Sequence, residues 1–193
     1  MSDRITQIRN ALNMHCVDKK TIDEIFSDGS LVNIIKRMEK VLCKHTLYKV
    51  MESYACETEA DLAEPSSKND NELAGKTVYE KIVHLINTAP DFEEIICNPD
   101  NTLAVTWSFE EHGKYKCVCN AMDNDMKISD LALKSGETGD YTMPLSYCIC
   151  CAGSCRIYFQ SQVGIKLRTK EVTSSPLNSK GEKPCSFVFT VVD

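Results

Sequence analysis

The sequence has no run of about 18 apolar residues, so it offers no segment able to cross a bilayer as a helix. Its first residues, Met1 to Arg4, lack the apolar region of a secretory signal, and we therefore expect a cytoplasmic protein. Basic residues are in deficit as well, since 22 Lys and Arg against 28 Asp and Glu give a net charge of −6. This balance argues against nucleic acid as the main partner, because phosphate contacts need a basic surface.

Histidine is scarce, with four in 193 residues. Cys43 and His45 lie two positions apart on an expected helix, so their side chains face about 200° apart and do not bind one metal ion together. We find no combination of Cys, His and acidic residue of the kind that nucleophilic enzymes use. An enzyme that works through a thiolate is therefore the alternative interpretation of this chain.

Cysteine, in contrast, is abundant, at 11 residues. The densest stretch, S-Y-C-I-C-C-A-G-S-C-R-I-Y-F, runs from Ser146 to Phe159. Its four thiols are those of Cys148, Cys150, Cys151 and Cys155. Disulfides do not persist in a reducing compartment, and an odd number of cysteines cannot all pair, so clustered thiols indicate metal binding or redox chemistry.

Hydrophobic periodicity predicts a helical N-terminal part over residues 1–90. From Leu31 to Met51 apolar residues recur at three- and four-residue intervals, which predicts one amphipathic helix or a helix pair that faces the core, with Ser30 as its N-cap. The other expected helices run from Ser2 or Asp3 to Leu12, from Ile22 to Phe26, and from Thr77 to Ile86.

The period changes after Pro99, where apolar residues alternate with polar or small ones. We expect a β-hairpin with strands from Leu103 to Phe109 and from Tyr115 to Cys119, around a turn that contains Gly113. The polar segment that follows, residues 121–141, is expected to hold one short helix. After it we expect a helix from Cys150 to Val163, ended by Gly164, and strands over Ile165 to Thr169 and Cys185 to Val191.

This order predicts an α+β fold in a single domain, with a helical part over 1–90 and a cysteine-rich, sheet-containing part over 95–193. Helices followed by two hairpins with a helix between them favour an antiparallel sheet that carries helices on one side.

The two groups of thiols converge if the first hairpin packs against the start of the cysteine-rich helix. Cys117 and Cys119 share one face of their expected strand, while Cys148, Cys151 and Cys155 share one face of the helix. Structural zinc sites use four tetrahedral ligands at a Zn–S distance of about 2.3 Å. Side chains two apart on an ideal strand stand roughly 6.5 Å apart, so the hairpin has to bend or end at Cys119. We predict a zinc site at Cys117, Cys119, Cys148 and Cys151, with an iron–sulfur cluster on the same residues as the alternative.

Two other interpretations of the cluster stay open. Free cysteine is among the most buried residue types, so a helix facing a sheet can use thiols as small apolar filler. The remaining interpretation is thiol chemistry by Cys150 and Cys151, or by the Cys-x-x-Cys pair, at a helix start that stabilises a thiolate.

Charged residues near the cluster are weaker candidates. Arg156 is placed to meet an anionic ligand group, although a salt bridge on the exposed face is the simpler explanation. Lys166, Arg168 and Lys170 alternate along an expected strand and form most simply a solvated face. The loop over residues 174–181 lies between strands, so it is interpreted as a connection and not as a phosphate-binding loop.

A helix that ends at Gly164, a strand that ends in Glu171, a loop with Gly181 and the run Cys185-Ser186-Phe187 follow one another at the C-terminal end. This series resembles the closing part of the 4-vinyl-reductase-like domain, a bacterial and archaeal ligand-binding module. The segments Y-C-I-C-C-A-G, G-I-K-L-R-T-K-E-V and K-P-C-S-F-V-F are also similar to a group of small cysteine-rich bacterial proteins of unknown activity.

The resemblance implies the fold shared with haem-nitric-oxide sensors and vesicle-tethering subunits, in which N-terminal helices precede an antiparallel sheet. It also implies a homodimer through the N-terminal helices and a small-molecule pocket that Glu171 and Cys185 line. The related pattern has a second cysteine where this chain has Ser174, so a two-thiol switch is not expected. The resulting hypothesis is a non-catalytic, zinc-thiolate domain that binds or senses a small molecule, and the alternative is a thiol-dependent enzyme using the 148–155 cluster.

Overall fold

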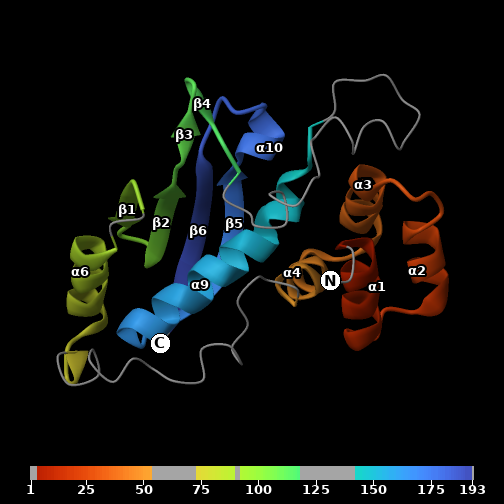
Figure 1. Cartoon of the computed structure of the whole chain (residues 1–193). Coiled ribbons are helices and arrows are strands. Elements are labelled where there is room, and N and C mark those ends of the chain that lie inside the picture. Colours follow the sequence, from red (N-terminus) through yellow and green to blue (C-terminus); the bar gives the residue numbers. More distant parts are fainter. Residues whose placement is uncertain (1–3, 54–72, 90–91, 118–141, 193) are drawn as a thin grey trace.

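The computed structural model describes residues 4–53, 73–89, 92–117 and 142–192, and the account of the fold is confined to them. It is a mixed structure of helices and one main antiparallel sheet, as the sequence predicts (Figure 1). None of the described helices is long and apolar enough to cross a membrane. The short helix expected within residues 121–141 and the second half of the strand expected to end at Cys119 lie outside the described residues.

The N-terminal part is helical, as expected. Its helices are α1 (Arg4–Met14), α2 (Lys19–Ile25), α3 (Leu31–Val41), α4 (Lys44–Glu52) and α6 (Val78–Thr88). The long amphipathic pattern forms a helix pair, because Leu42 and Cys43 are extended and separate α3 from α4. Thr77 and Glu80 form a capping box at the start of α6, in which each side chain satisfies a backbone N–H of the other residue.

Four strands form the main sheet in the order β1-β2-β6-β5, and every neighbouring pair is antiparallel. The strands are β1 (Glu94–Cys97), β2 (Thr102–Trp107), β5 (Lys166–Ser174) and β6 (Cys185–Val192). Leu103 lies opposite Phe189, and Val105 opposite Phe187, and all four side chains are buried. This shared face is the sheet's contribution to the core.

The first hairpin differs from the prediction. A turn at His112 and Gly113 exists, but it joins two short strands, β3 (Glu110–Glu111) and β4 (Lys114–Tyr115), that form a separate two-stranded sheet. The neighbours of β2 are β6 and β1, and β1 was not predicted. Its sequence, E-I-I-C, is only four residues long and does not alternate, so periodicity gives no signal for it.

The connection between the last two strands also contains more structure than expected. Residues Pro176–Ser179 form a short helix, α10, whose N-cap is Ser175. Gly181 follows it at φ 81°, and a Cβ atom there would lie 3.1 Å from the carbonyl oxygen of Tyr115. Glycine is needed at this point both for the positive φ and for the close approach of the small hairpin.

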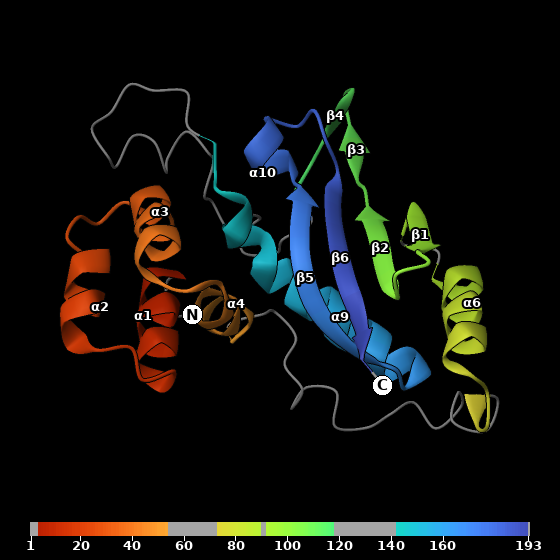
Figure 2. The ribbon, with the colours of Figure 1, turned by 180° about the vertical axis from the view of Figure 1, so that it is seen from behind.

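Helix α9 (Ile149–Val163) lies across one face of the sheet, and a 3₁₀ turn, η1 (Leu145–Cys148), leads into it (Figures 1 and 2). It ends at Gly164 in the left-handed region (φ 62°), which confirms the predicted end of the helix. Both views place α4 between α9 and the α1–α3 group, and α6 beside β1 at the opposite end. Among the described helices, none covers the other face of the sheet (Figure 2).

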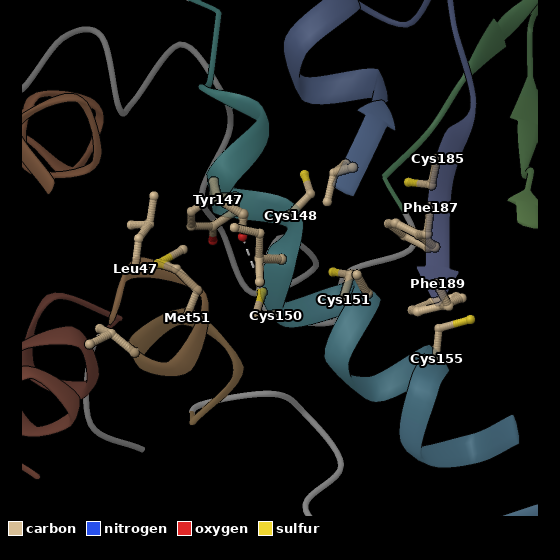
Figure 3. Close-up of a cluster of buried hydrophobic side chains, with 14 of the residues drawn as sticks. Leu47, Met51, Tyr147, Cys148, Cys150, Cys151, Cys155, Cys185, Phe187 and Phe189 are labelled. Atoms are coloured by element: carbon tan, nitrogen blue, oxygen red, sulfur yellow. Dashed lines mark hydrogen bonds between the residues drawn. The ribbon is translucent and has the colours of Figure 1, made fainter. Parts of the chain in front are cut away.

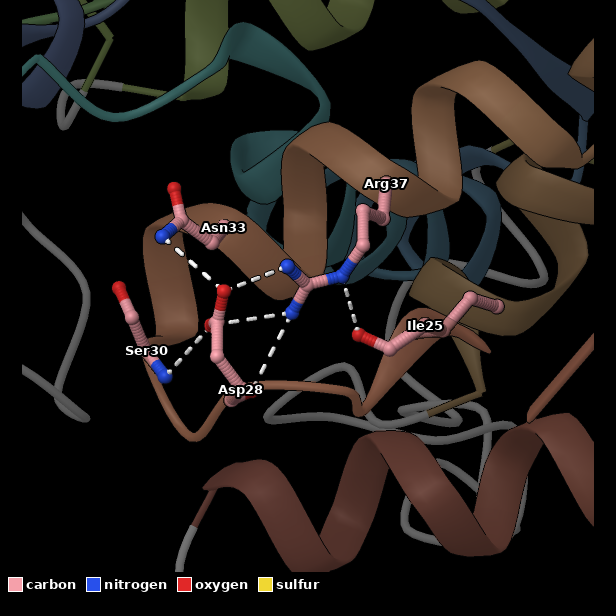
Figure 4. A network of polar contacts seen from close by, with 5 residues as sticks. All are labelled: Ile25, Asp28, Ser30, Asn33 and Arg37. Atoms are coloured by element: carbon pink, nitrogen blue, oxygen red, sulfur yellow. Dashed lines mark hydrogen bonds and ion pairs between the residues drawn. The ribbon is translucent and has the colours of Figure 1, made fainter. Parts of the chain in front are cut away.

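Arg37 ties the turn between α2 and α3 to the helix that follows it (Figure 4). Its guanidinium donates to both carboxylate oxygens of Asp28, at 2.7 and 3.0 Å, and its Nε donates to the carbonyl oxygen of Ile25 at 2.7 Å. The hydrogen bonds from Arg37 are the largest cause that holds the pKa of Asp28 below its ordinary value. Since the folded-state pKa is lowered, this contribution to stability is present at neutral pH and is lost as the pH falls through that pKa.

We predict that Arg37→Ala lowers the free energy of unfolding by about 1–2 kcal/mol, because the substitution removes a two-pronged ion pair and a bond to a helix-end carbonyl. Arg37→Lys keeps the positive charge but not the two-pronged guanidinium, so it should lower the free energy of unfolding by only part of this amount. Urea unfolding at neutral pH and again at about pH 3 measures both. A destabilisation that does not shrink in acid would contradict the role of the Asp28 carboxylate.

Candidate functional site

The cysteine cluster lies inside the protein. Cys150 has no exposed surface, and Cys148, Cys151, Cys155 and Cys185 are between 2% and 7% exposed. All five belong to one continuous apolar core that also contains the aromatic side chains of β6. This burial favours the interpretation of the cluster as small apolar filler.

The thiols do not point to one place (Figure 3). Cys150 is directed toward α4, on the side where Leu47 and Met51 lie, and its Sγ donates to the carbonyl oxygen of Tyr147 at 3.3 Å. Cys155 is directed toward the sheet side of α9 instead. The cluster therefore divides between the two surfaces against which α9 packs.

The predicted zinc ligands are only partly within the described residues. Cys148 is the last residue of η1 and Cys151 lies in the first turn of α9, whereas Cys117 follows β4 and belongs to no strand. Cys119 lies outside the described residues. Within the described ranges, no three His, Cys, Asp or Glu side chains are grouped so that they could hold a metal ion. The described members of the set thus do not fit a zinc or iron–sulfur site by themselves.

The fold changes the acidity of a cysteine outside the cluster. Cys43 is exposed at the N-cap of α4, and its Sγ lies 3.2 Å from the Oγ1 of Thr46. The hydrogen bond with this hydroxyl is the first cause that lowers the pKa of the Cys43 thiol below its ordinary value. Sequence reasoning considered Cys43 only as a metal ligand, because its position at a helix start becomes evident only once α3 and α4 separate.

Two adjoining cavities lie in a groove between α4 and the edge strand β5. The first, of about 440 Å³, is bounded by α3, α4, η1 and β5, and the second, of about 600 Å³, by α4 and β5 alone. Lys44 and Tyr48 line both of them. We call this feature the α4–β5 groove. Ligand sites are mostly concave surfaces of this size with a few polar groups, which makes the groove the candidate site.

A β-bulge in β5 shapes one wall of the groove. The pairing with β6 shifts register between Thr169 and Glu171, so no residue of β6 lies opposite Lys170 and the strict alternation of side chains stops there. As a result Thr169 and Val172, three residues apart, are both buried. Glu171 lies in the wall of the first cavity, which is where the predicted pocket residue is found. Bulges of this kind often re-aim side chains beside functional sites.

Tyr48 stands between the two cavities. Burial raises the pKa of its hydroxyl above the ordinary value, and the carboxylates of Glu171 and Glu52 raise it further. The Nζ of Lys44 lies 5.2 Å from the centre of its ring. The phenol therefore stays protonated at neutral pH and keeps a hydrogen-bond donor at the junction of the cavities.

Three other residues considered in the sequence analysis do not line either cavity. Arg156 forms an ion pair with Glu52, at 3.6 Å, and its side chain is 14% exposed, so the salt bridge expected for it exists but is mostly covered. Cys185 is buried opposite Trp107 and is not in the wall of either cavity. Ser174, at the position of the missing second thiol, donates to the carbonyl oxygen of Pro184 at 2.7 Å.

The sequence analysis did not single out Lys44, Tyr48 or Thr169. Their signal was weak, since the first two are ordinary members of an amphipathic helix and the third is one of several alternating strand residues. Only the packing of α4 beside β5 brings them together.

Comparisons with known protein families, with curated proteins and with solved structures find no match for this chain.

We predict that a thiol reagent labels Cys16, Cys43 and Cys97 in the native protein, since all three are exposed, and that it labels the 148–155 cluster only after denaturation. Peptide mapping by mass spectrometry after short exposure to iodoacetamide, with and without guanidinium, measures this. Rapid native labelling within the 148–155 cluster would contradict the packing interpretation and would favour the thiol-dependent enzyme.

Proposed function

We propose that this protein is a non-catalytic domain that binds or senses a small molecule in the α4–β5 groove. The observation that carries the proposal is the pair of adjoining cavities, which share Lys44 and Tyr48 and have Glu171 in one wall. The resemblance to the 4-vinyl-reductase-like domain supports the same class of function and the same glutamate. The homodimer and the cytoplasmic location expected from the sequence stay predictions.

The chemistry of the groove favours binding over catalysis. Its walls hold charged and hydroxyl groups, but among the described residues that line it there is no cysteine, and its one histidine is His45. The buried thiols of the 148–155 cluster belong to the apolar core. They can stabilise the core without taking part in a reaction, so the thiol-dependent enzyme remains the alternative.

Filling the groove tests the proposal. Val172 is buried in the wall of the first cavity, so Val172→Phe should occupy part of this space and reduce ligand binding at least tenfold. Val188 lies on the neighbouring strand and is half-buried on the opposite face of the sheet, which makes Val188→Phe the matched control. Native mass spectrometry of the protein after incubation with a cell extract detects the bound compound in each variant. A compound that binds Val172→Phe as well as it binds the unchanged protein contradicts the groove as the site.

We also propose, as a separate element, that zinc contributes to the stability of the fold through Cys117, Cys119, Cys148 and Cys151. The proposal rests on the number of thiols in the sequence, since the described members of the set are not grouped around one point.

If the four thiolates hold one ion, the purified protein carries about one zinc per chain, and Cys119→Ser or Cys148→Ser removes it and lowers stability. Cys97→Ser, at an exposed thiol on β1, is the control and should leave the metal content unchanged. Elemental analysis by mass spectrometry gives the number directly. Protein that is fully folded and free of zinc and iron would end the metal proposal and leave the groove proposal intact.

A further inference from the structure

The second cavity of the groove gathers positive charge in a chain that is acidic overall. Lys44 and Lys49 reach it from α4 and Arg168 from β5, whereas the chain as a whole carries a net charge of −6. The only acidic residue that lines this cavity among the described residues is Glu52, and its carboxylate is already paired with Arg156. The cavity therefore has an excess of cations, which a bound anion would balance.

The first cavity has the opposite character. Glu39 and Glu171 lie in its wall, together with Lys44, which it shares with its neighbour. Glu39 accepts a hydrogen bond from the hydroxyl of Ser146 at 2.7 Å. An anion is consequently favoured at the end of the groove near Arg168 and disfavoured at the end near Glu171.

A buried hydroxyl in the second cavity has no partner. Thr169 lines the cavity and is 6% exposed, and among the described residues its Oγ1 meets no hydrogen-bond donor or acceptor. Leaving a buried hydroxyl unpaired costs about 1–3 kcal/mol, so native structures rarely retain one without a reason. The Oγ1 itself has almost no exposed surface, so a ligand oxygen would accept this hydrogen bond once the Thr169 side chain turns toward the cavity that it lines.

The neighbouring groups suit the same kind of ligand. Helix α4 begins at Lys44, and two residues of its first turn, Lys44 and His45, line the cavity. The Tyr48 hydroxyl is protonated at neutral pH, and burial and nearby carboxylates raise its pKa further above that range. Cations and two hydroxyl donors together match an oxyanion.

We propose that the second cavity of the α4–β5 groove binds the oxyanion group, carboxylate or phosphate, of a small organic acid. Lys49 and Arg168 supply the counter-charges, and Thr169 donates a hydrogen bond to the anion. This inference rests on the proposed function and names the chemical class of its ligand.

Titration calorimetry with two probes, inorganic phosphate and succinate, tests the inference and separates the two oxyanions. At least one probe should bind, and its affinity should fall as the salt concentration rises from about 50 to 200 mM. Arg168→Gln should weaken the binding about tenfold or more, since it removes a charged hydrogen-bond donor. Lys166→Gln is the matched control, because Lys166 lies two residues away on the same strand but does not line the cavity, and it should change the affinity less than twofold.

Thr169→Val gives a readout that a purely structural residue would not give. It should weaken anion binding about fivefold, yet leave the unfolding midpoint in urea unchanged or raise it, because it removes an unpaired hydroxyl without changing the size of the side chain. Loss of stability without loss of affinity would overturn the role of Thr169.

Three outcomes decide the rest. Binding of a probe that Arg168→Gln weakens and Lys166→Gln does not supports the inference. If neither probe binds, but a neutral compound binds the unchanged protein and not the Val172→Phe variant, the anion site is overturned and the proposed function stands. Failure of both probes with no compound in the groove at all overturns both.

Discussion

Helix α9 packs on two sides, against α4 through one face and against the sheet through the other, and the fold depends on this double contact. Its first half is built from small side chains in the run C-C-A-G-S-C, which let the backbones of neighbouring elements come close. Its second half carries two aromatic residues, Tyr158 and Phe159, and the ring centroid of Phe159 lies 4.8 Å from that of Phe92 and 6.3 Å from that of Phe189. The helix therefore has small side chains where α4 contacts it and large side chains at the end near α6 and β1.

The sequence allowed the parts of this arrangement that rest on local signals to be predicted. Gly164 ends α9 because only a residue tolerant of positive φ fits there, and Thr77 begins α6 because its side chain caps the helix. The partners of β2 could not be predicted in the same way, since pairing with β6 joins residues about 80 positions apart. The α4–β5 groove could not be predicted for the same reason, because its walls are a helix and a strand that are distant in the sequence and share no local pattern.

The cysteines show how one composition supports different physical roles. Four thiols in eight positions suggest a common ligand when only their spacing is known, because helical periodicity places three of them on one face. In the structure Cys148 belongs to a 3₁₀ turn that precedes the α-helix, so the rotation per residue changes just before Cys151. Cys150 then faces α4 while its neighbours face other surfaces (Figure 3). Cysteine is a small apolar side chain, and such side chains suit a helix like α9 that packs against α4 on one side and the sheet on the other.

The same packing explains why the groove exists. Helix α4 packs on the first half of α9, where the side chains are small, and on η1, so it lies beside β5 without covering it. The resulting α4–β5 groove is bordered by long side chains such as those of Lys49 and Arg168. A groove that served only the fold would be more stable if apolar side chains sealed it, since a buried unpaired hydroxyl is costly. Among the described residues the buried Thr169 hydroxyl finds no partner, and this opposes stability. Local features that oppose stability are common at functional sites, and here the unpaired hydroxyl lies beside a bulge in the edge strand β5.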